Sequence, residues 1–309
     1  MSLTVDAQQT WQVTQYMSNA YLVNPATAGE REMLDLNVSF RQQWLGSQYA
    51  PRTFYVSGTS QIFAPRKVNS TTLPTSSDYQ PNKKGKLRHA VGGIVLQDQF
   101  GAFSYTSFGA SYNVHVPLSK SWTLSTALKA TAKNWVFDPS KTQTGTAQDP
   151  TLSAFAANSQ AFNDWIPSID FGVYAYSRYL FFSYASDQLT QGELQFENAP
   201  VSPALQMTHY GMVGGRIPLN QATHIVPSTL IKYTAVAPPS VDVNVKLDVQ
   251  DRYFIAAGYR WNSDITLTGA VFVSDLVKVG YSFDYPITET RSLGFGSHEL
   301  FLGIELFKK

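Results

Sequence analysis

The chain has 309 residues, of which 14% are aromatic and only 15% are charged, and its formal net charge at pH 7 is +1. A typical globular domain carries about 25% charged residues, so this composition suits a protein whose exterior faces lipid. The small net charge argues against a nucleic-acid partner. The absence of cysteine fits bacterial envelope proteins and many cytoplasmic proteins alike.

No run of 18 or more apolar residues occurs in the sequence, which excludes a transmembrane helix. Lipid leaves one other spanning structure, a closed β-barrel, because every backbone donor and acceptor must be paired internally. The strands of such a barrel are only half apolar, so a mean hydropathy of -0.16 is compatible with one.

The N-terminal segment, residues 1–30, precedes the predicted barrel at 31–309. Gln9–Ala20 reads as a short helix that ends before Asn24-Pro25 and plugs or braces the barrel.

The start of the chain, Met1–Ala7, has neither the basic region nor the apolar core of a signal peptide. Val5-Asp6-Ala7, before Gln8, nevertheless resembles the small-x-small end of a cleavage site. We therefore expect a trimmed or mis-assigned start and a mature chain that begins near Gln8.

Period-two alternation is the main signal along the chain. In 241–250, apolar side chains at odd positions alternate with polar side chains at even positions, and 34–41 and 276–285 repeat the design. This pattern predicts an all-β fold, a transmembrane up-and-down antiparallel β-barrel of about 14 strands. The predicted strands are 33–44, 52–63, 90–98, 103–116, 121–135, 167–176, 179–187, 206–217, 223–235, 240–250, 253–262, 264–273, 276–285 and 297–307.

The connections also follow the pattern of an outer-membrane barrel. Tight turns follow even-numbered strands, at 117–120, 177–178, 218–221, 250–252 and 274–275. Long segments at 138–165 and 187–205 follow odd-numbered ones, and the short side of such barrels is periplasmic. One long polar insert, 65–89, falls on the short side, so it is either a real periplasmic feature or a sign of a miscount.

Other all-β folds also alternate, so soluble sandwiches and propellers stay open on pattern alone. No self-similarity at 40–50 residues is found, which counts against a propeller.

The sequence offers little for catalysis. None of the five histidines pairs with another at metal-ligand spacing, and no nucleophile or phosphate-binding motif occurs. We expect no enzyme activity, no metal and no cofactor. A barrel lipase would need a Ser-His pair; His115 and His298 lie on predicted strands, but nothing in the sequence ties either to a serine.

Charged residues on the inner faces of the strands are predicted to neutralise one another, because a buried single charge is costly. The acids are Asp242, Asp248, Asp284, Glu299 and Glu305, and the counter-charges are Lys246, Lys278 and Arg260.

The two ends of the chain resemble the PorP/SprF family of type IX secretion membrane proteins. The resemblance begins with Tyr21-Leu22-Val23-Asn24-Pro25-Ala26-Thr27-Ala28-Gly29 and Arg41-Gln42-Gln43-Trp44. It continues through Gly258-Tyr259-Arg260 and Val279-Gly280-Tyr281-Ser282-Phe283-Asp284 to Gly296-Ser297-His298-Glu299-Leu300. Thr27, where the family commonly has an aromatic residue, and Lys308-Lys309 after Phe307 depart from it.

This resemblance implies a non-enzymatic protein of the bacterial outer membrane that serves type IX secretion or gliding motility. It implies binding of the C-terminal domains of secreted cargo, such as adhesins and proteases, and association with periplasmic ring or lipoprotein components.

The motif residues also have structural readings. Asn24-Pro25 would turn the chain, with Gly29 at positive φ, Arg41 would pair in the lumen and Trp44 would sit at the rim. Ser297-His298-Glu299 would form a polar rim or lumen cluster. Arg260 and Asp284 belong to the same set of structural or partner-contact candidates. Cargo is expected to bind the long loops 138–165 and 187–205.

Two other functions remain open. A channel of the fatty-acid-transporter or porin type is the main alternative, against which bulky inner residues such as Tyr174, Tyr176, Phe254 and Phe272 speak mildly. A barrel lipase is the weaker one.

Overall fold

The structure is a computed structural model that describes residues 14–47, 50–62, 86–138, 162–192, 205–250, 252–288 and 294–306. It contains three short 3-10 turns, η1 (Gln15–Met17), η2 (Ala20–Leu22) and η3 (Pro25–Thr27). The β segments are β1 (Leu34–Gln42), β2 (Arg52–Ile62), β3 (Arg88–Phe100), β4 (Phe103–Pro117), β5 (Thr123–Phe137), β6 (Phe162–Tyr176), β7 (Leu180–Asp187), β8 (Thr208–Gly215), β9 (Ile217–Pro218), β10 (Thr223–Thr234), β11 (Ala237–Val249), β12 (Tyr253–Arg260), β13 (Asp264–Phe272), β14 (Val277–Pro286) and β15 (Ser297–Leu306).

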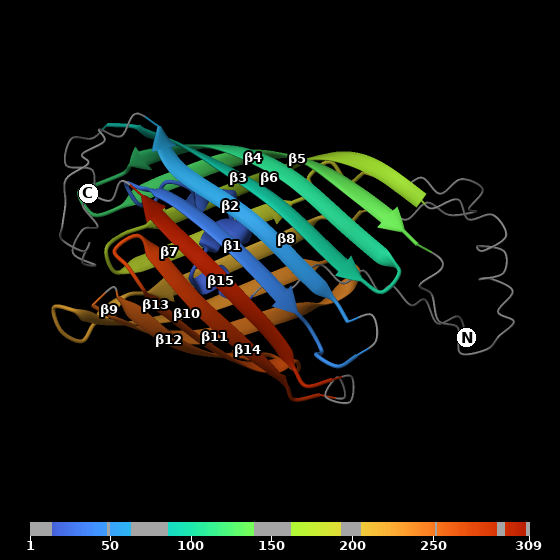
Figure 1. The fold of residues 1–309 in the computed structure, drawn as a ribbon. Coiled ribbons are helices and arrows are strands. Elements are labelled where there is room, and N and C mark those ends of the chain that lie inside the picture. The colour runs from blue at the N-terminus through green and yellow to red at the C-terminus, as the bar shows by residue number, and fades with distance from the viewer. Residues whose placement is uncertain are drawn as a thin grey trace, which may run out of the picture.

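These segments form one closed antiparallel barrel (Figure 1). Each strand pairs with its neighbours in the sequence, and β15 returns to pair with β1 from Leu34↔Leu306 to Gln42↔His298. β8 and β9 are two pieces of one strand, because both pair with β10, so the described barrel has fourteen strands. The predicted fold class is confirmed.

Alternating burial explains why these residues close into a barrel. On β12, Ile255 is 61% exposed on the outer wall while its neighbour Ala256 is 5% exposed on the inner wall. The outer wall is apolar and the inner wall is largely polar, as the alternation in sequence predicts. None of the described residues forms a helix long and apolar enough to span a membrane.

The two ends of the barrel differ in their connections. One end of the barrel, which we call the turn end, has the β4–β5, β6–β7, β9–β10, β11–β12 and β13–β14 connections. We call the opposite end the loop end. The turn end has only short connections apart from 63–87, of which 63–85 lies outside the described residues. Because β2 pairs with β1 from Arg52 to Thr59 and with β3 along its whole length, the strand count there is correct and the long connection is at the turn end. The loop end has the longer connections, but 101–102 and 235–236 are tight.

Two predicted boundaries are wrong. The expected loop 138–165 ends earlier, because β6 begins at Phe162 and pairs with β5 along its whole length. The expected strand 206–217 is divided at Arg216 into β8 and β9, although the Arg216 N–H still bonds the Tyr179 carbonyl at 2.7 Å, in register with the β7–β8 ladder.

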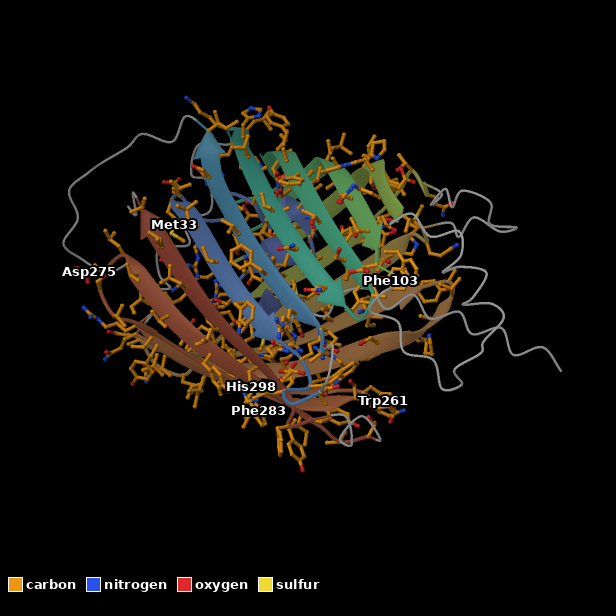
Figure 2. All side chains as sticks on the ribbon, turned by 45° about the vertical axis from the view of Figure 1, so that its right-hand side comes forward. Met33, Phe103, Trp261, Asp275, Phe283 and His298 are labelled. Atoms are coloured by element: carbon orange, nitrogen blue, oxygen red, sulfur yellow. The ribbon has the colours of Figure 1, made fainter. Side chains whose placement is uncertain are left out.

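Aromatic side chains mark both rims of the outer wall. At the loop end Phe103, Phe283 and Trp261, which is 64% exposed, lie opposite the end marked by Met33 and Asp275 (Figure 2). Near the turn end, Trp122 stacks on Phe182. Rings of this kind favour the headgroup level of a membrane, so the two rims delimit the membrane band.

Candidate functional site

The lumen of the barrel holds the chain's own N-terminal part. We call Thr14–Met33 the lumenal segment. The hydroxyl of Thr14 bonds Asp284 near the loop end, and Arg31 pairs with Glu305 near the turn end, so the segment runs the length of the barrel. Residues Tyr16, Tyr21, Asn24 and Ala26 of the segment are at most 3% exposed.

The helix predicted over 9–20 is wrong for the described residues, which form separate 3-10 turns instead. The cause is side-chain bonding to the wall. Gln15 donates to Ser282 on one side, and Asn19 donates to Ser57 at 2.8 Å on another. Tyr21 bonds the Ser111 hydroxyl at 3.0 Å. A lumenal wall that offers polar partners all round replaces the hydrogen bonds of a regular helix.

Asn24 binds the lumenal segment to the wall where β6 pairs with β7. Its Nδ2 donates to the Val173 carbonyl at 2.9 Å and to the Ser183 hydroxyl at 2.7 Å, while its Oδ1 accepts from Ala26 N–H at 2.8 Å. The wall leaves room for this amide because residue 172 is glycine: a Cβ there would lie 2.1 Å from Asn24 Oδ1.

The rest of the Asn-Pro-Ala-Thr-Ala-Gly motif presents backbone carbonyls to the wall. Asn113 donates to the Pro25 carbonyl, and His115 Nε2 bonds the Ala28 carbonyl at 2.8 Å. Gly29 has φ +74° and packs so closely on the wall that a Cβ would lie 2.3 Å from the Ala90 side chain. The motif is therefore a docking element, with Asn24, Pro25 and Gly29 each at a contact.

The loop-end charge cluster consists of Arg41, Arg260, Asp242, Asp264, Asp284 and Glu299. Arg41 bonds Asp284 at 2.6 Å, Glu299 at 3.4 Å and the Thr14 hydroxyl at 3.1 Å. Arg260 pairs with Asp242 at 3.1 Å and Asp264 at 3.2 Å, and lies 3.9 Å from Asp284. Arg41, Arg260, Asp284 and Glu299 are at most 4% exposed. Burial at this level is tolerable because every charge has an opposite neighbour.

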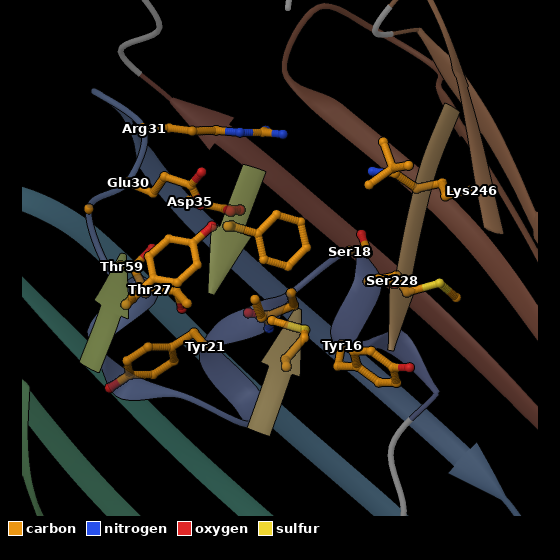
Figure 3. Close-up of a pocket in the computed structure, with 18 of the residues that line it drawn as sticks. Tyr16, Ser18, Tyr21, Thr27, Glu30, Arg31, Asp35, Thr59, Ser228 and Lys246 are labelled. Atoms are coloured by element: carbon orange, nitrogen blue, oxygen red, sulfur yellow. The ribbon is translucent and has the colours of Figure 1, made fainter. Parts of the chain in front are cut away.

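Near the turn end, Lys278 lies 3.9 Å from Glu305 and donates to the Ser18 hydroxyl, and Lys246 pairs with Asp248 at 3.3 Å. The predicted lumenal counter-charges are confirmed. A cavity of about 150 Å³ lies here between the lumenal segment and the wall. Glu30, Arg31, Asp35 and Lys246 surround it (Figure 3).

Two further ion pairs in the lumen were not predicted from the sequence. Lys129 bonds Asp170 at 2.9 Å and Lys133 bonds Asp187 at 2.7 Å, all on the inner wall of β5, β6 and β7. Lys129, Thr131 and Lys133 share one face of a strand, and this spacing is the signal that would have found them.

The structure separates His298 from Glu299. Glu299 points inward to the loop-end charge cluster, while His298 lies on the outer wall, where its Nδ1 bonds Tyr281 and its ring packs 5.1 Å from Phe283. The expected polar cluster of Ser297, His298 and Glu299 is therefore wrong, because neighbours on a strand face opposite sides.

Trp44 lies at the rim of the loop end, just after β1, with φ 44°. The next residue, Leu45, exchanges backbone bonds with Gly296 and Phe295. Trp44 thus belongs to a rim contact between the β1–β2 and β14–β15 connections.

The lumenal histidine is not arranged for acyl transfer. The Nδ1 atom of His115 hydrogen-bonds the Tyr176 hydroxyl at 3.0 Å, and its Nε2 atom bonds the Ala28 carbonyl of the lumenal segment. Ser125 faces it across the strand pair, but its hydroxyl has no partner in the described part of the chain. Among the described residues there is also no group of three or more His, Asp or Glu side chains placed to hold a metal ion.

A closed antiparallel barrel with an apolar, ring-bordered exterior and an occupied, charged lumen defines an outer-membrane β-barrel protein. Residues 5–304 match the family described as type IX secretion system membrane protein PorP/SprF. The chain belongs to this family, as its two terminal motifs predict. No curated protein matches the sequence.

Solved structures with a similar fold include two monoaromatic hydrocarbon channels. CymD has a TM-score of 0.54 at 10% identity, covering 95% of this chain and 92% of its own. The TodX deltaS2S3 mutant has a TM-score of 0.51 at 9% identity, covering 93% and 94%. A FadL homologue from Pseudomonas aeruginosa has a TM-score of 0.49 at 9% identity, covering 90% of each chain. These likenesses concern the fold alone.

Proposed function

We propose that this protein is a holding barrel of the type IX secretion machinery, which binds secreted cargo and retains or helps to display it at the cell surface. The observation that carries the proposal is membership of a secretion-system membrane family over residues 5–304. Type IX function requires the protein to work on other proteins, and the lumen argues for a scaffold rather than a conduit.

The lumenal argument rests on burial. A wide water-filled path beside the loop-end charge cluster would leave its side chains exposed to solvent, whereas Asp284 and Glu299 are 0% and 1% exposed. The lumenal segment adds bonds to β4, β6, β7 and β14. A barrel filled in this way offers a rigid wall and loops for binding.

The proposed partners lie at the two ends. Short turns face the periplasm in outer-membrane barrels, so the turn end would meet the periplasmic ring or lipoprotein components. The loop end would face outward and contact the C-terminal domains of cargo, including gliding adhesins and proteases.

The test is co-purification from the native host. A C-terminally tagged copy is extracted from the outer membrane in mild detergent, and co-purifying chains are identified by mass spectrometry. We expect a secreted protein with a C-terminal sorting domain, held through that domain and lost when the domain is deleted. Recovery of the barrel free of secreted chains, under conditions that keep other secretion components together, would contradict the proposal.

The competing function is a channel for small molecules. The fold likeness to hydrocarbon channels raises this alternative, although identities of 9–10% carry no function across. Conductance across a planar bilayer separates the two, because a steady open current favours the channel.

A further inference from the structure

Among the described residues, the strand pairing of the barrel wall is incomplete on one side of β6. β6 pairs with β5 from Phe162 to Tyr176, but it pairs with β7 only from Phe171 to Tyr176. In the described part of the chain, no strand pairs with β6 on that side between Phe162 and Asp170. We call Phe162–Asp170 the open edge.

The backbone groups of the open edge can be assigned by alternation. The carbonyl of Ile169 accepts from Leu189 N–H at 2.9 Å, so it points away from β5. The backbone groups of successive residues in an antiparallel strand bond to opposite sides. The backbone groups of Pro167, Trp165 and Asn163 therefore also point away from β5. The carbonyl of Pro167 accepts from the Thr190 hydroxyl at 3.2 Å.

Pro167 fits this assignment, because proline has no N–H and is tolerated where a strand has no neighbour. Beyond it, Trp165 and Asn163 present N–H and carbonyl groups at strand spacing.

A cavity of about 580 Å³ lies along the open edge. Outer-wall residues Trp165 and Ile169, inner-wall residues Ile166 and Ser168, and Thr190 and Gly192 line it. The residues that line the cavity therefore come from both faces of the wall.

The position of Trp165 indicates the membrane depth at which the open edge begins. It is 54% exposed on the outer wall and stacks on Phe108, while Trp122 marks the opposite rim of the same wall, next to the start of β5 at Thr123. The open edge thus begins at the loop-end rim, at the headgroup level, where an extracellular chain can reach it.

We propose that the open edge binds an extended strand of a partner protein, which adds to the sheet beside β6. The partner strand would bond Asn163 and Trp165 through its backbone and place alternate side chains against Trp165 and Ile169. The outward backbone groups of Asn163 and Trp165 have no partner in the described part of the chain, whereas Pro167 and Ile169 bond residues 189–190. The two free positions select a strand, because neither an acyl chain nor a helix supplies donors and acceptors at this spacing. This inference rests on the proposed function, since it takes the partner to be the secreted cargo.

The test uses three variants of the full-length protein and the cargo C-terminal domain that co-purifies with it. Trp165→Pro removes one N–H from the open edge and leaves the β5 ladder intact, while Trp165→Ala removes the same ring and keeps the N–H. We expect the Kd for the domain to rise about tenfold or more for Trp165→Pro and no more than about threefold for Trp165→Ala. Pro167→Val is the control: it adds an N–H beside Thr190, outside the stretch that the partner strand bonds, so its Kd should change by less than about threefold.

A photo-crosslinking residue at position 163, in cells, identifies the neighbour. We expect crosslinks to one extended peptide of the cargo domain. Crosslinks to residues 139–161 or 193–204 of the same chain, or equal effects of Trp165→Pro and Trp165→Ala, would overturn the strand-addition proposal while cargo binding stands. If the wild type binds no cargo at all, the proposed function fails and this inference fails with it. Each variant must first fold, as judged by a heat-sensitive shift in gel mobility.

Discussion

Asn24 holds the lumenal segment through both ends of its amide, in a space that exists because residue 172 has no side chain. We expect Gly172→Ala to cost about 1–3 kcal/mol of stability, because the new methyl overlaps Asn24 Oδ1 and the packed segment must shift. The measurement is urea unfolding of the barrel in detergent, followed by tryptophan fluorescence.

Gly211→Ala is the matched control. Residue 211 is also a strand glycine, but a Cβ there meets nothing within 4 Å. Equal effects of the two alanines would mean that the cost lies in the strand rather than in the contact with Asn24.

Arg41 compensates two buried carboxylates, Asp284 and Glu299. Replacing it by methionine leaves these acids without their nearest cation, at an expected cost of about 3–5 kcal/mol in the same unfolding assay. Adding Asp284→Asn and Glu299→Gln to Arg41→Met should recover most of that loss, because the charges then vanish together.

Arg252 provides the comparison for an exposed pair. It lies 3.7 Å from Asp275, and both side chains are largely exposed. Arg252→Ala should therefore cost under about 1 kcal/mol. A loss as large as that of Arg41→Met would contradict the importance of burial.

At the residue scale, the sequence predicted which acids and bases face the lumen but not which of them meet. Arg41 and Asp284 are far apart in sequence and come together because barrel closure places β15 beside β1 and β14 beside β15. The position of His298 was predictable: it follows Ser297 and precedes Glu299 on one strand, so period two alone puts it outside.

At the scale of elements, strands were predictable because each carries its own alternation and its own turns. The lumenal segment was not, since its conformation depends on partners from β2, β4, β6 and β14 that no local pattern encodes. The start of β6 was missed for a related reason. Pro167 looks like a strand boundary, yet it is accommodated within β6 because its missing N–H faces the open edge.

At the scale of the whole molecule, the lumenal segment decides whether a fourteen-stranded barrel conducts. The full-length protein should show no steady conductance in a planar bilayer, because the segment and the loop-end charge cluster fill the lumen. A variant that lacks residues 1–30 keeps every strand of the barrel. We expect it to fold with reduced stability and to pass a steady ionic current, since the wall it uncovers is polar.

The full-length protein and the variant without residues 1–30 together separate a scaffold from a channel. A steady current through the full-length protein would favour the channel over the holding barrel. No current through a folded variant without residues 1–30 would instead show that the side chains of the wall close the lumen by themselves. The charge-neutral triple variant at Arg41, Asp284 and Glu299, combined with the deletion, then tests the wall directly: without the ion pairs that hold these side chains together, the current should rise further.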